Sequence, residues 1–139
     1  MKNGLDKVTT LLLILFLWIG VSPASAKVSP TYQNVTVEQA LTIIQENRKN
    51  SMFVIIDVRT PAEFQQGHIE GAVLIDILSP SFNNKINSLD KTKQYFVYCR
   101  SGNRSRRAMD FMEKLKFEKV YNMKGGFKDW ASKGFNYIY

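Results

Sequence analysis

Hydrophobic and polar positions along the chain predict strands and helices in alternation. Short apolar runs, typical of buried strands, occupy residues 52–56, 72–75, 95–98 and 119–122. Apolar residues at helical spacing predict helices over residues 37–48, 108–115 and 125–133, with a weaker helical pattern at 77–89. Residues 28–34 form a partly extended lead-in. This alternation predicts an α/β fold, an open parallel sheet with helices on both faces.

Two helix starts carry recognisable capping residues. Thr36 is followed three positions later by Gln39, the spacing of a capping box. Thr60 is followed by Pro61 and Glu63, which adds proline at the first helical position and an acid at the third. These residues predict a helix after Thr36 and a short helix after Thr60.

The N-terminus has the three parts of a secretory signal peptide. Lys2 and Lys7 precede an apolar run over residues 11–19, and Ala24-Ser25-Ala26 supplies a small-residue cleavage site. A membrane anchor usually needs about 20 apolar residues, and this run is shorter, so no stable membrane anchor is expected. We expect a signal peptide over residues 1–26, one domain over residues 27–139, and a periplasmic or secreted protein.

Composition narrows the candidate chemistry. The chain has 19 basic and 12 acidic residues and a formal net charge of +7. Without a long basic helix or an aromatic-plus-basic repeat, this excess does not indicate nucleic acid. With one cysteine and one histidine, neither a zinc site nor any other metal or cofactor is expected. One cysteine also cannot form an internal disulfide, so in an exported protein it is either an intermolecular partner or a reactive thiol.

That cysteine, Cys99, opens the loop between the strand at 95–98 and the next helix. Unpaired N–H groups at a helix start, together with the helix dipole, favour a thiolate and predict a lowered Cys99 pKa. Gly102 permits a positive φ in the loop. Four arginines follow Cys99 within eight residues: Arg100, Arg104, Arg106 and Arg107. An anionic small substrate accounts for them, although a cysteine at the end of a buried strand can also be an inert core residue.

Asp57 and Arg59 stand at the end of the strand that covers residues 52–56. The binding crevice of an open α/β sheet lies at the carboxyl ends of its strands. The Asp57–Arg59 segment and Cys99 are therefore expected to share one crevice.

Three motifs resemble rhodanese-like domains. Residues 57–72 (DVRTPAEFQQGHIEGA) resemble their N-terminal signature, 99–105 (CRSGNRS) their active-site loop, and 125–130 (GGFKDW) their C-terminal element. The resemblance covers nearly all of residues 27–139, in the right order. It implies a single domain with a five-stranded parallel sheet and a sulfurtransferase activity.

By this resemblance, Cys99 takes the outer sulfur of thiosulfate or a related small anion as a persulfide, and a thiol or cyanide accepts it. Arg100 and Arg104 would hold the sulfonate oxygens. The loop N–H groups would come from Ser101, Gly102, Asn103 and Ser105, and Ser105 would also cap the helix. Asp57 and Arg59 would pair with each other or with loop groups and so support the loop from behind. His68 would belong to a turn, and Phe127 and Trp130 would pack the last helix.

Two alternatives remain open. Cysteine-dependent phosphatases and arsenate reductases occur on the same fold, but their loops resemble C-x5-R, whereas Cys99 to Arg104 is C-x4-R. The shorter loop should be too tight for a phosphate ester. A non-catalytic sulfur carrier or partner-binding module is the other alternative, and the retained cysteine argues for catalysis.

Overall fold

The computed structural model describes residues 29–139. The predicted signal peptide at residues 1–26 lies outside this range. Within it, no helix is long and apolar enough to cross a membrane. The elements follow one another as β1 (Thr31–Val35), α1 (Val37–Glu46), β2 (Phe53–Asp57), α2 (Pro61–Gln65), β3 (Val73–Leu74), α3 (Phe82–Asn87), β4 (Gln94–Tyr98), α4 (Asn103–Lys114), β5 (Lys119–Met123) and α5 (Gly126–Ser132).

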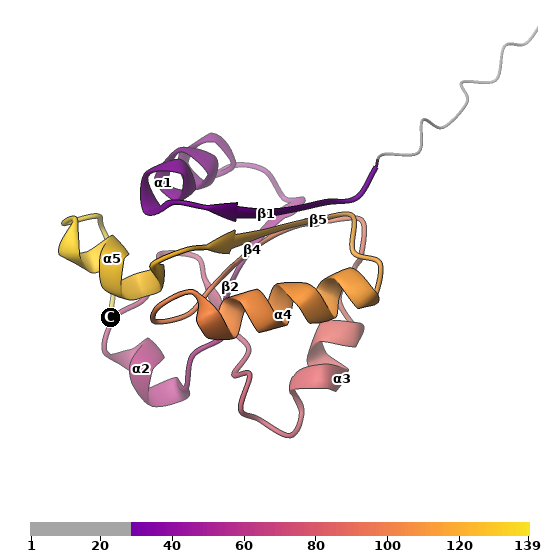
Figure 1. The fold of residues 1–139 in the computed structure, drawn as a ribbon. Coiled ribbons are helices and arrows are strands. Elements are labelled where there is room, and N and C mark those ends of the chain that lie inside the picture. The colour runs from indigo at the N-terminus through magenta and orange to yellow at the C-terminus, as the bar shows by residue number, and fades with distance from the viewer. Residues whose placement is uncertain (1–28) are drawn as a thin grey trace, which may run out of the picture.

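The five strands form one parallel sheet in the order β1-β5-β4-β2-β3. α1 and α5 lie on one face, and α3 and α4 lie on the other (Figure 1). The predicted α/β fold is therefore confirmed, including the five strands that the family resemblance implied. β4 is flanked by β5 and β2, so its carboxyl end lies in the middle of the sheet edge.

Each face of the sheet carries its own apolar core. On the α4 face, residues from α3, α4, β2, β4 and β5 pack together, among them Ile56, Ile86, Val97, Met112 and Val120. On the α1 face, the packed residues include Ala40, Ile55, Phe96, Met123 and Trp130. Strands β2 and β4 contribute to both cores, which explains why their sequences are continuously apolar. Trp130 packs α5 on the sheet, as predicted.

The capping residues start their helices as predicted. Thr36 and Gln39 form a reciprocal capping box at α1. At α2, the Glu63 amide donates to the Thr60 hydroxyl oxygen, and the Thr60 amide donates to the Glu63 carboxylate. α2 follows β2 at the carboxyl edge of the sheet and buries none of its residues. This position leaves the Glu63 side chain facing the neighbouring loop after β4.

Two details of the fold differ from the pattern. Residues 31–35 form the strand β1, where the pattern showed only a partly extended lead-in. β1 lies at the edge of the sheet and pairs with β5 alone, so it needs few apolar residues. The helical pattern at 77–89 is confirmed only for α3, because Leu78 and the turns around Pro80 lie outside the helix.

Candidate active site

The loop after β4 is shaped by a glycine in the left-handed region. Cys99 follows directly on β4, and Gly102 is the residue before α4, with φ of +96°. A Cβ at Gly102 would lie 3.0 Å from the Met123 carbonyl oxygen. Both the positive φ and the lack of room for a side chain therefore require glycine at position 102. The positive φ was predicted from the sequence. The tight turn points the amide N–H groups of the loop back toward Cys99.

The Cys99 sulfur lies at the base of this loop, and the residue is 1% exposed. The Gly102 amide donates to Sγ at 3.1 Å, and the Ser105 hydroxyl donates to it at 3.4 Å. Burial raises the thiol pKa, but hydrogen bonds from Ser105 and from the Ser101 and Gly102 amides outweigh it and lower the Cys99 pKa. The predicted direction of the shift is confirmed.

Ser105 has a different role from the capping role predicted for it. α4 has no side-chain cap, and its N-cap position is taken by Gly102. Ser105 stands at the third helical position, fully buried, with its hydroxyl on the Cys99 sulfur. The capping prediction was wrong because the helix begins two residues before Ser105, at Asn103. The result is a side-chain donor aimed at the nucleophile.

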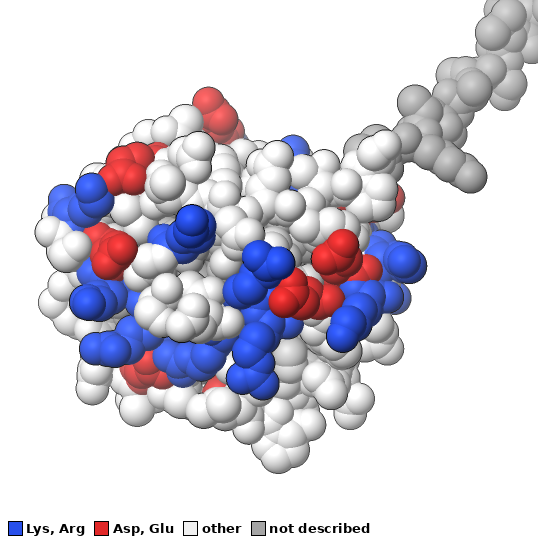
Figure 2. All heavy atoms as spheres, in the orientation of Figure 1, with Lys and Arg blue, Asp and Glu red and all other residues white. Residues whose placement is uncertain are grey.

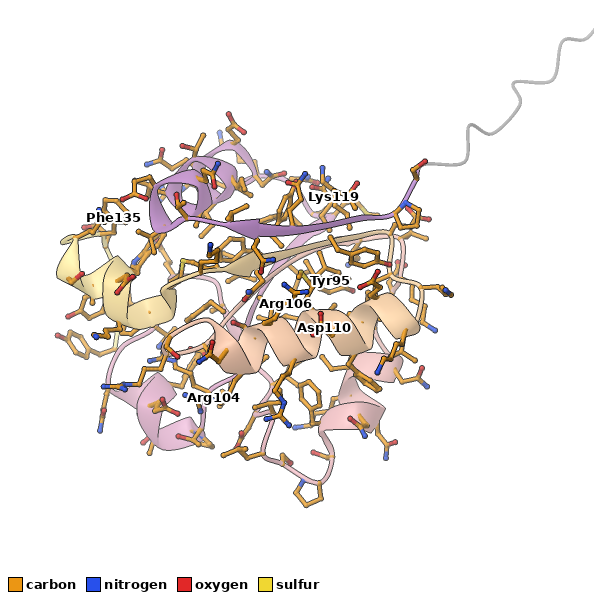
Figure 3. The ribbon with its side chains drawn as sticks, in the orientation of Figure 1. Tyr95, Arg104, Arg106, Asp110, Lys119 and Phe135 are labelled. Carbon is orange, nitrogen blue, oxygen red and sulfur yellow. The ribbon has the colours of Figure 1, made fainter. Side chains whose placement is uncertain are left out.

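Arg104 is held by a carboxylate that the sequence did not associate with the loop. Its two terminal nitrogens donate to the two carboxylate oxygens of Glu63 at 2.8 and 2.7 Å. In Figure 3 the Arg104 side chain extends from the start of α4 toward α2. The hydrogen bond from Arg104, acting against partial burial, lowers the pKa of Glu63 to about 2. The paired-donor contact expected between Arg104 and a sulfonate is thus made with Glu63 here.

Arg104 nevertheless remains close to the sulfur. Its pKa is raised first by the hydrogen bond to Glu63 and in addition by the Cys99 thiolate. The pair with Glu63 uses only two of its N–H donors, one on each terminal nitrogen. Arg104 can therefore face Glu63 and an anion at Cys99 together.

The remaining predicted loop residues lie at the mouth. Arg100, Ser101 and Asn103 are exposed, and their side chains make no hydrogen bond within the part of the chain that the structure describes. The Ser101 amide contributes to the Cys99 environment. The predicted contact between Arg100 and a sulfonate stays a prediction, and the exposed position of Arg100 is compatible with it.

Asp57 and Arg59 form a buried ion pair behind the loop. The Arg59 guanidinium donates to the Asp57 carboxylate over distances of 2.6–3.0 Å and to the Gly67 carbonyl at 2.7 Å. Burial opposes the charge on Arg59, but the bonds to Asp57 prevail and raise the Arg59 pKa. The Phe127 ring covers the guanidinium at 4.2 Å. Mutual pairing of the two residues was among the arrangements expected from the sequence.

The segment after β5 connects this pair to the loop. The Phe127 amide donates to the Cys99 carbonyl at 2.7 Å, while its ring contacts Arg59. The Lys128 amide donates to the Arg100 carbonyl at 3.0 Å. A Cβ at Gly126 would lie 2.6 Å from the Arg100 carbonyl carbon. The packing role predicted for Phe127 was incomplete, because its backbone also fixes the base of the Cys99 loop.

Comparison with known families agrees with this geometry. The model of the rhodanese-like domain matches residues 36–133, a span that contains every residue of the loop and its supports. The chain belongs to the rhodanese-like domain family. The resemblance seen in the three sequence motifs is thereby confirmed.

Several relatives of this rhodanese-like domain carry sulfurtransferase names. It is 32% identical over 101 residues to the thiosulfate sulfurtransferase GlpE of Pseudomonas entomophila, covering 73% of this chain and 86% of that one. It is 39% identical over 79 residues to the uncharacterized protein YqhL of Bacillus subtilis, covering 57% of this chain and 61% of YqhL. A crystal structure of a rhodanese-related protein from Thermoplasma volcanium superimposes with a TM-score of 0.64 at 29% identity, over 77% of this chain and 98% of that chain.

His68, the one histidine of the chain, is engaged in structure. Its Nδ1 lies 3.0 Å from the Phe64 carbonyl, and its ring stacks on that of Phe64 at 3.7 Å. Its backbone pairs with Ile138 near the C-terminus. These contacts agree with the predicted place of His68 in a turn of this rhodanese-like domain.

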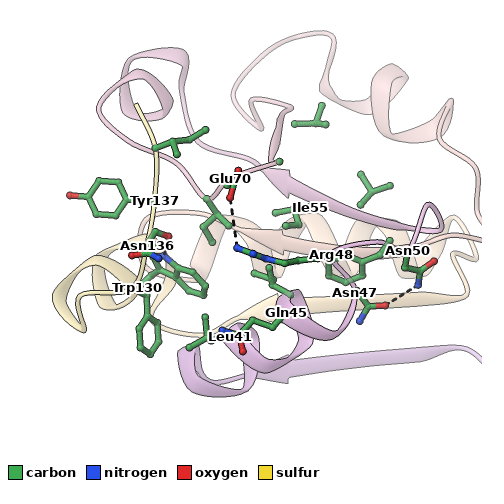
Figure 4. Close-up of a pocket in the computed structure, with 18 of the residues that line it drawn as sticks. Leu41, Gln45, Asn47, Arg48, Asn50, Ile55, Glu70, Trp130, Asn136 and Tyr137 are labelled. Carbon is green, nitrogen blue, oxygen red and sulfur yellow. Dashed lines mark hydrogen bonds and ion pairs between the residues drawn. The ribbon is translucent and has the colours of Figure 1, made fainter.

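Away from the Cys99 loop, the described residues offer no metal-binding cluster and form a groove. Among residues 29–139 no cluster of three or more histidine, cysteine or acidic side chains has metal-binding geometry. A groove of about 770 Å³ lies between α1, the β2 edge and the C-terminal residues, with the Arg48–Glu70 ion pair beside it (Figure 4). Its lining includes no residue from 99 to 105. The groove of this rhodanese-like domain is therefore separate from the loop that holds Cys99.

Proposed function

We propose that the protein is a sulfurtransferase that moves the outer sulfur of thiosulfate, or of a related anionic donor, to a thiol or to cyanide. The observation that carries this proposal is the Cys99 sulfur, which accepts hydrogen bonds from the Gly102 amide and the Ser105 hydroxyl. These donors favour the thiolate, and the thiolate is the nucleophilic form of cysteine. The family membership and the names of the relatives support the same reaction class.

In the first step, the Cys99 thiolate attacks the outer sulfur of thiosulfate. A bond forms between Sγ and that sulfur, the S–S bond of thiosulfate breaks, and its electron pair leaves with sulfite. In the second step, a thiolate or cyanide attacks the outer sulfur of the persulfide. The new bond forms on the acceptor, and the electron pair of the broken bond returns to Cys99 as thiolate.

The loop supplies what both steps require. Its amide groups and Ser105 stabilise negative charge on Cys99 before attack and on its departure in the second step. The exposed Arg100 side chain has no partner among the residues that the structure describes, and Arg104 retains N–H donors beyond those used by Glu63. Both can therefore bind the sulfonate oxygens. Asp57 and Arg59 hold the loop through Phe127 and do not touch the substrate in this proposal.

The test replaces the nucleophile. Cys99→Ser should reduce thiocyanate formation from thiosulfate and cyanide to the background rate, since serine offers no thiolate. Mass spectrometry of the wild type after thiosulfate should show one added sulfur on Cys99, and an aryl phosphate assayed in parallel should react more slowly than thiosulfate. Turnover by the serine variant close to that of the wild type would exclude this mechanism.

We propose further that residues 1–26 are removed on export, so that the protein acts in the periplasm or outside the cell. The basic start, the apolar run and Ala24-Ser25-Ala26 support this proposal. N-terminal sequencing of the native protein should begin at Lys27. An intact Met1 on the active protein would contradict it.

A further inference from the structure

Basic side chains around the Cys99 loop fall into two classes. Three arginines are paired with carboxylates: Arg59 with Asp57, Arg104 with Glu63, and Arg106 with Asp110. Four exposed basic residues have no ion-pair partner among residues 29–139: Arg100, Arg107, Lys124 and Lys128. The second class therefore supplies positive charge that the fold itself leaves unbalanced.

The two lysines are brought to the loop by backbone contacts. The Lys124 Cα would lie 3.3 Å from a Cβ at Gly102, and the Lys128 amide is bonded to the Arg100 carbonyl. Asp129, the acid next to Lys128, turns back over Gly125 at the start of α5. Both lysine side chains are exposed. The positions of Lys124 and Lys128 beside the loop are thus fixed by the same segment that supports Cys99.

The surface view shows the result. Lys and Arg side chains gather around the region where the loop after β4, the start of α4 and the segment before α5 meet (Figure 2). Acidic side chains interrupt this gathering at only a few places on that face. The positive charges come from four places in the fold: Arg100 from the loop, Arg107 from α4, Lys124 from the turn after β5, and Lys128 from α5.

The exposed basic residues are more numerous than the binding of one small sulfur donor requires. A thiosulfate at Cys99 would be held inside the loop by amide groups, Arg100 and Arg104. Arg107, Lys124 and Lys128 extend the positive surface outward from the loop onto α4, the turn after β5 and α5. Like charges gathered in this way repel one another, and an acidic partner surface relieves that repulsion and accelerates encounter.

The burial of Cys99 limits the shape of such a partner. Because the residue is 1% exposed, an acceptor thiol must enter the loop, while the groups around the thiol contact the rim. A flat anionic surface such as a membrane offers no thiol at that point. A flexible or protruding protein segment satisfies both requirements.

We propose that Arg107, Lys124 and Lys128, together with Arg100, form a docking surface for an acidic protein segment that carries the acceptor thiol. The inference rests on the proposed sulfurtransferase function and names its acceptor class. In the transfer step, the thiolate of the segment bonds to the outer sulfur of the Cys99 persulfide. The bond between Sγ and that sulfur breaks, and its electron pair stays on Cys99. The partner leaves as a persulfide, with no other oxidant or reductant involved.

Binding is tested without sulfur chemistry, in the Cys99→Ser protein. The probe is a fluorescent 12-residue peptide with one cysteine and mostly Asp and Glu, and its counterpart has Asn and Gln at those positions. The acidic peptide should bind more tightly, with an affinity that falls as salt is added. Lys124→Gln combined with Lys128→Gln should weaken its binding roughly three- to tenfold, because exposed charge pairs are individually weak.

The matched control is Lys49→Gln combined with Lys85→Gln, which removes the same charge from exposed positions on other elements. This control should leave peptide binding within about twofold of the unsubstituted protein. Equal binding of both peptides, or an equal loss in the control variant, would overturn the docking surface. Anionic phospholipid vesicles that bind through Lys124 and Lys128, without any preference between the peptides, would also overturn it in favour of a membrane.

Transfer assays separate this inference from the proposed function. In the protein with Cys99 intact, Lys124→Gln and Lys128→Gln should leave thiocyanate formation with cyanide unchanged and slow the transfer of sulfur to the acidic peptide. Failure to form any Cys99 persulfide would refute the proposed function, whereas the peptide-binding result stands independently of it. A persulfide that passes to the acidic and neutral peptides at one rate would refute the docking surface alone.

Discussion

The neighbouring strands β2 and β4 each carry buried polar groups at their carboxyl ends, and Asp57 at the end of β2 is in register with Tyr98 at the end of β4. At the end of β2, Asp57 is paired with Arg59, whose Nη2 also donates to the Gly67 carbonyl and whose guanidinium is covered by the Phe127 ring. At the end of β4, hydrogen-bond donors converge on the Cys99 sulfur beside an exposed arginine. We call the Asp57–Arg59 pair the closed centre, because each charge has a partner within the fold. We call Cys99 and its hydrogen-bond donors the open centre, because these donors can also bind an anion.

This difference indicates how a buried polar group can be assigned to structure or to chemistry. Burial alone does not distinguish the two centres, since Asp57 and Cys99 are both nearly inaccessible. What distinguishes them is whether the surrounding donors have a charged partner within the fold. Glu63 and Arg104 are intermediate, because they are paired with each other and also border the open site.

The largest expected effect on stability comes from removing Arg59, the counter-charge of the buried Asp57 carboxylate. Arg59→Ala should lower the free energy of unfolding by about 3–5 kcal/mol, since it leaves the Asp57 carboxylate buried without a counter-charge. Urea denaturation followed by circular dichroism measures the change. Adding Asp57→Asn to the same protein should recover a large part of the loss, because the uncompensated charge is then gone.

Arg48→Ala is the matched control for Arg59→Ala. Arg48 pairs with Glu70 on the surface, where both side chains are about 70% exposed. Its loss should change the free energy of unfolding by less than about 1 kcal/mol. Equal destabilisation by the two substitutions would remove the contrast between a closed buried centre and an ordinary surface pair.

The intermediate pair should give a smaller, pH-dependent effect. Glu63→Gln should lower the free energy of unfolding by about 1–2 kcal/mol at pH 7, a value reduced for the partial exposure of both side chains. The folded-state pKa of Glu63 is about 2, against an ordinary value of 4.5. Its contribution is therefore complete above about pH 4.5 and is lost as the pH falls through 2.

The unfolding midpoints of wild type and Glu63→Gln, measured at pH 7, 4 and 2.5, should therefore approach each other as the pH falls. Glu70→Gln is the control, since the Glu70 side chain is 74% exposed and its only ion pair within residues 29–139 is long, at 3.8 Å. A difference between wild type and Glu63→Gln that stays constant down to pH 2.5 would show that the carboxylate charge is not what stabilises the pair.

Local features of the sequence predicted the open centre better than the groups that support it. The apolar strand, Cys99, Gly102 and the following helix are adjacent in the chain, so their pattern contains the loop geometry. The Glu63–Arg104 pair joins residues 41 positions apart and depends on the adjacency of β2 and β4. No local pattern contains that information, although Glu63 at the third position of a helix after β2 was visible.

The same reasoning explains the differences in the fold. Strands β2 and β4 are buried on both faces, and their apolar runs predicted them within one residue. β1 was not predicted as a strand because an edge strand with exposed polar residues has no strong pattern of its own. Ser105 was assigned to capping because its type favours that role, and only the helix start at Asn103 shows otherwise.

The smallest predicted effect tests a single donor in the open centre. Ser105→Ala removes the hydroxyl that donates to Cys99 Sγ at 3.4 Å. The Cys99 pKa should then rise, because a hydrogen bond that stabilises the thiolate is lost; such a bond to a charged group contributes about 1.5 kcal/mol or somewhat more. Alkylation of Cys99 by iodoacetamide, followed by mass spectrometry across a pH series, measures that pKa directly.

Ser101→Ala is the control for the Ser105 substitution, because Ser101 contributes its backbone amide, which alanine retains. Its alkylation profile should match that of the wild type, while the Ser105→Ala profile moves to higher pH. At a fixed pH below the pKa, kcat/KM for thiosulfate should fall up to about tenfold in Ser105→Ala alone, following the smaller thiolate fraction. If the two serine variants titrate alike, the amide groups of the loop lower the Cys99 pKa without help from the Ser105 hydroxyl. The open centre would then be a feature of the backbone, set by Gly102 and the start of α4.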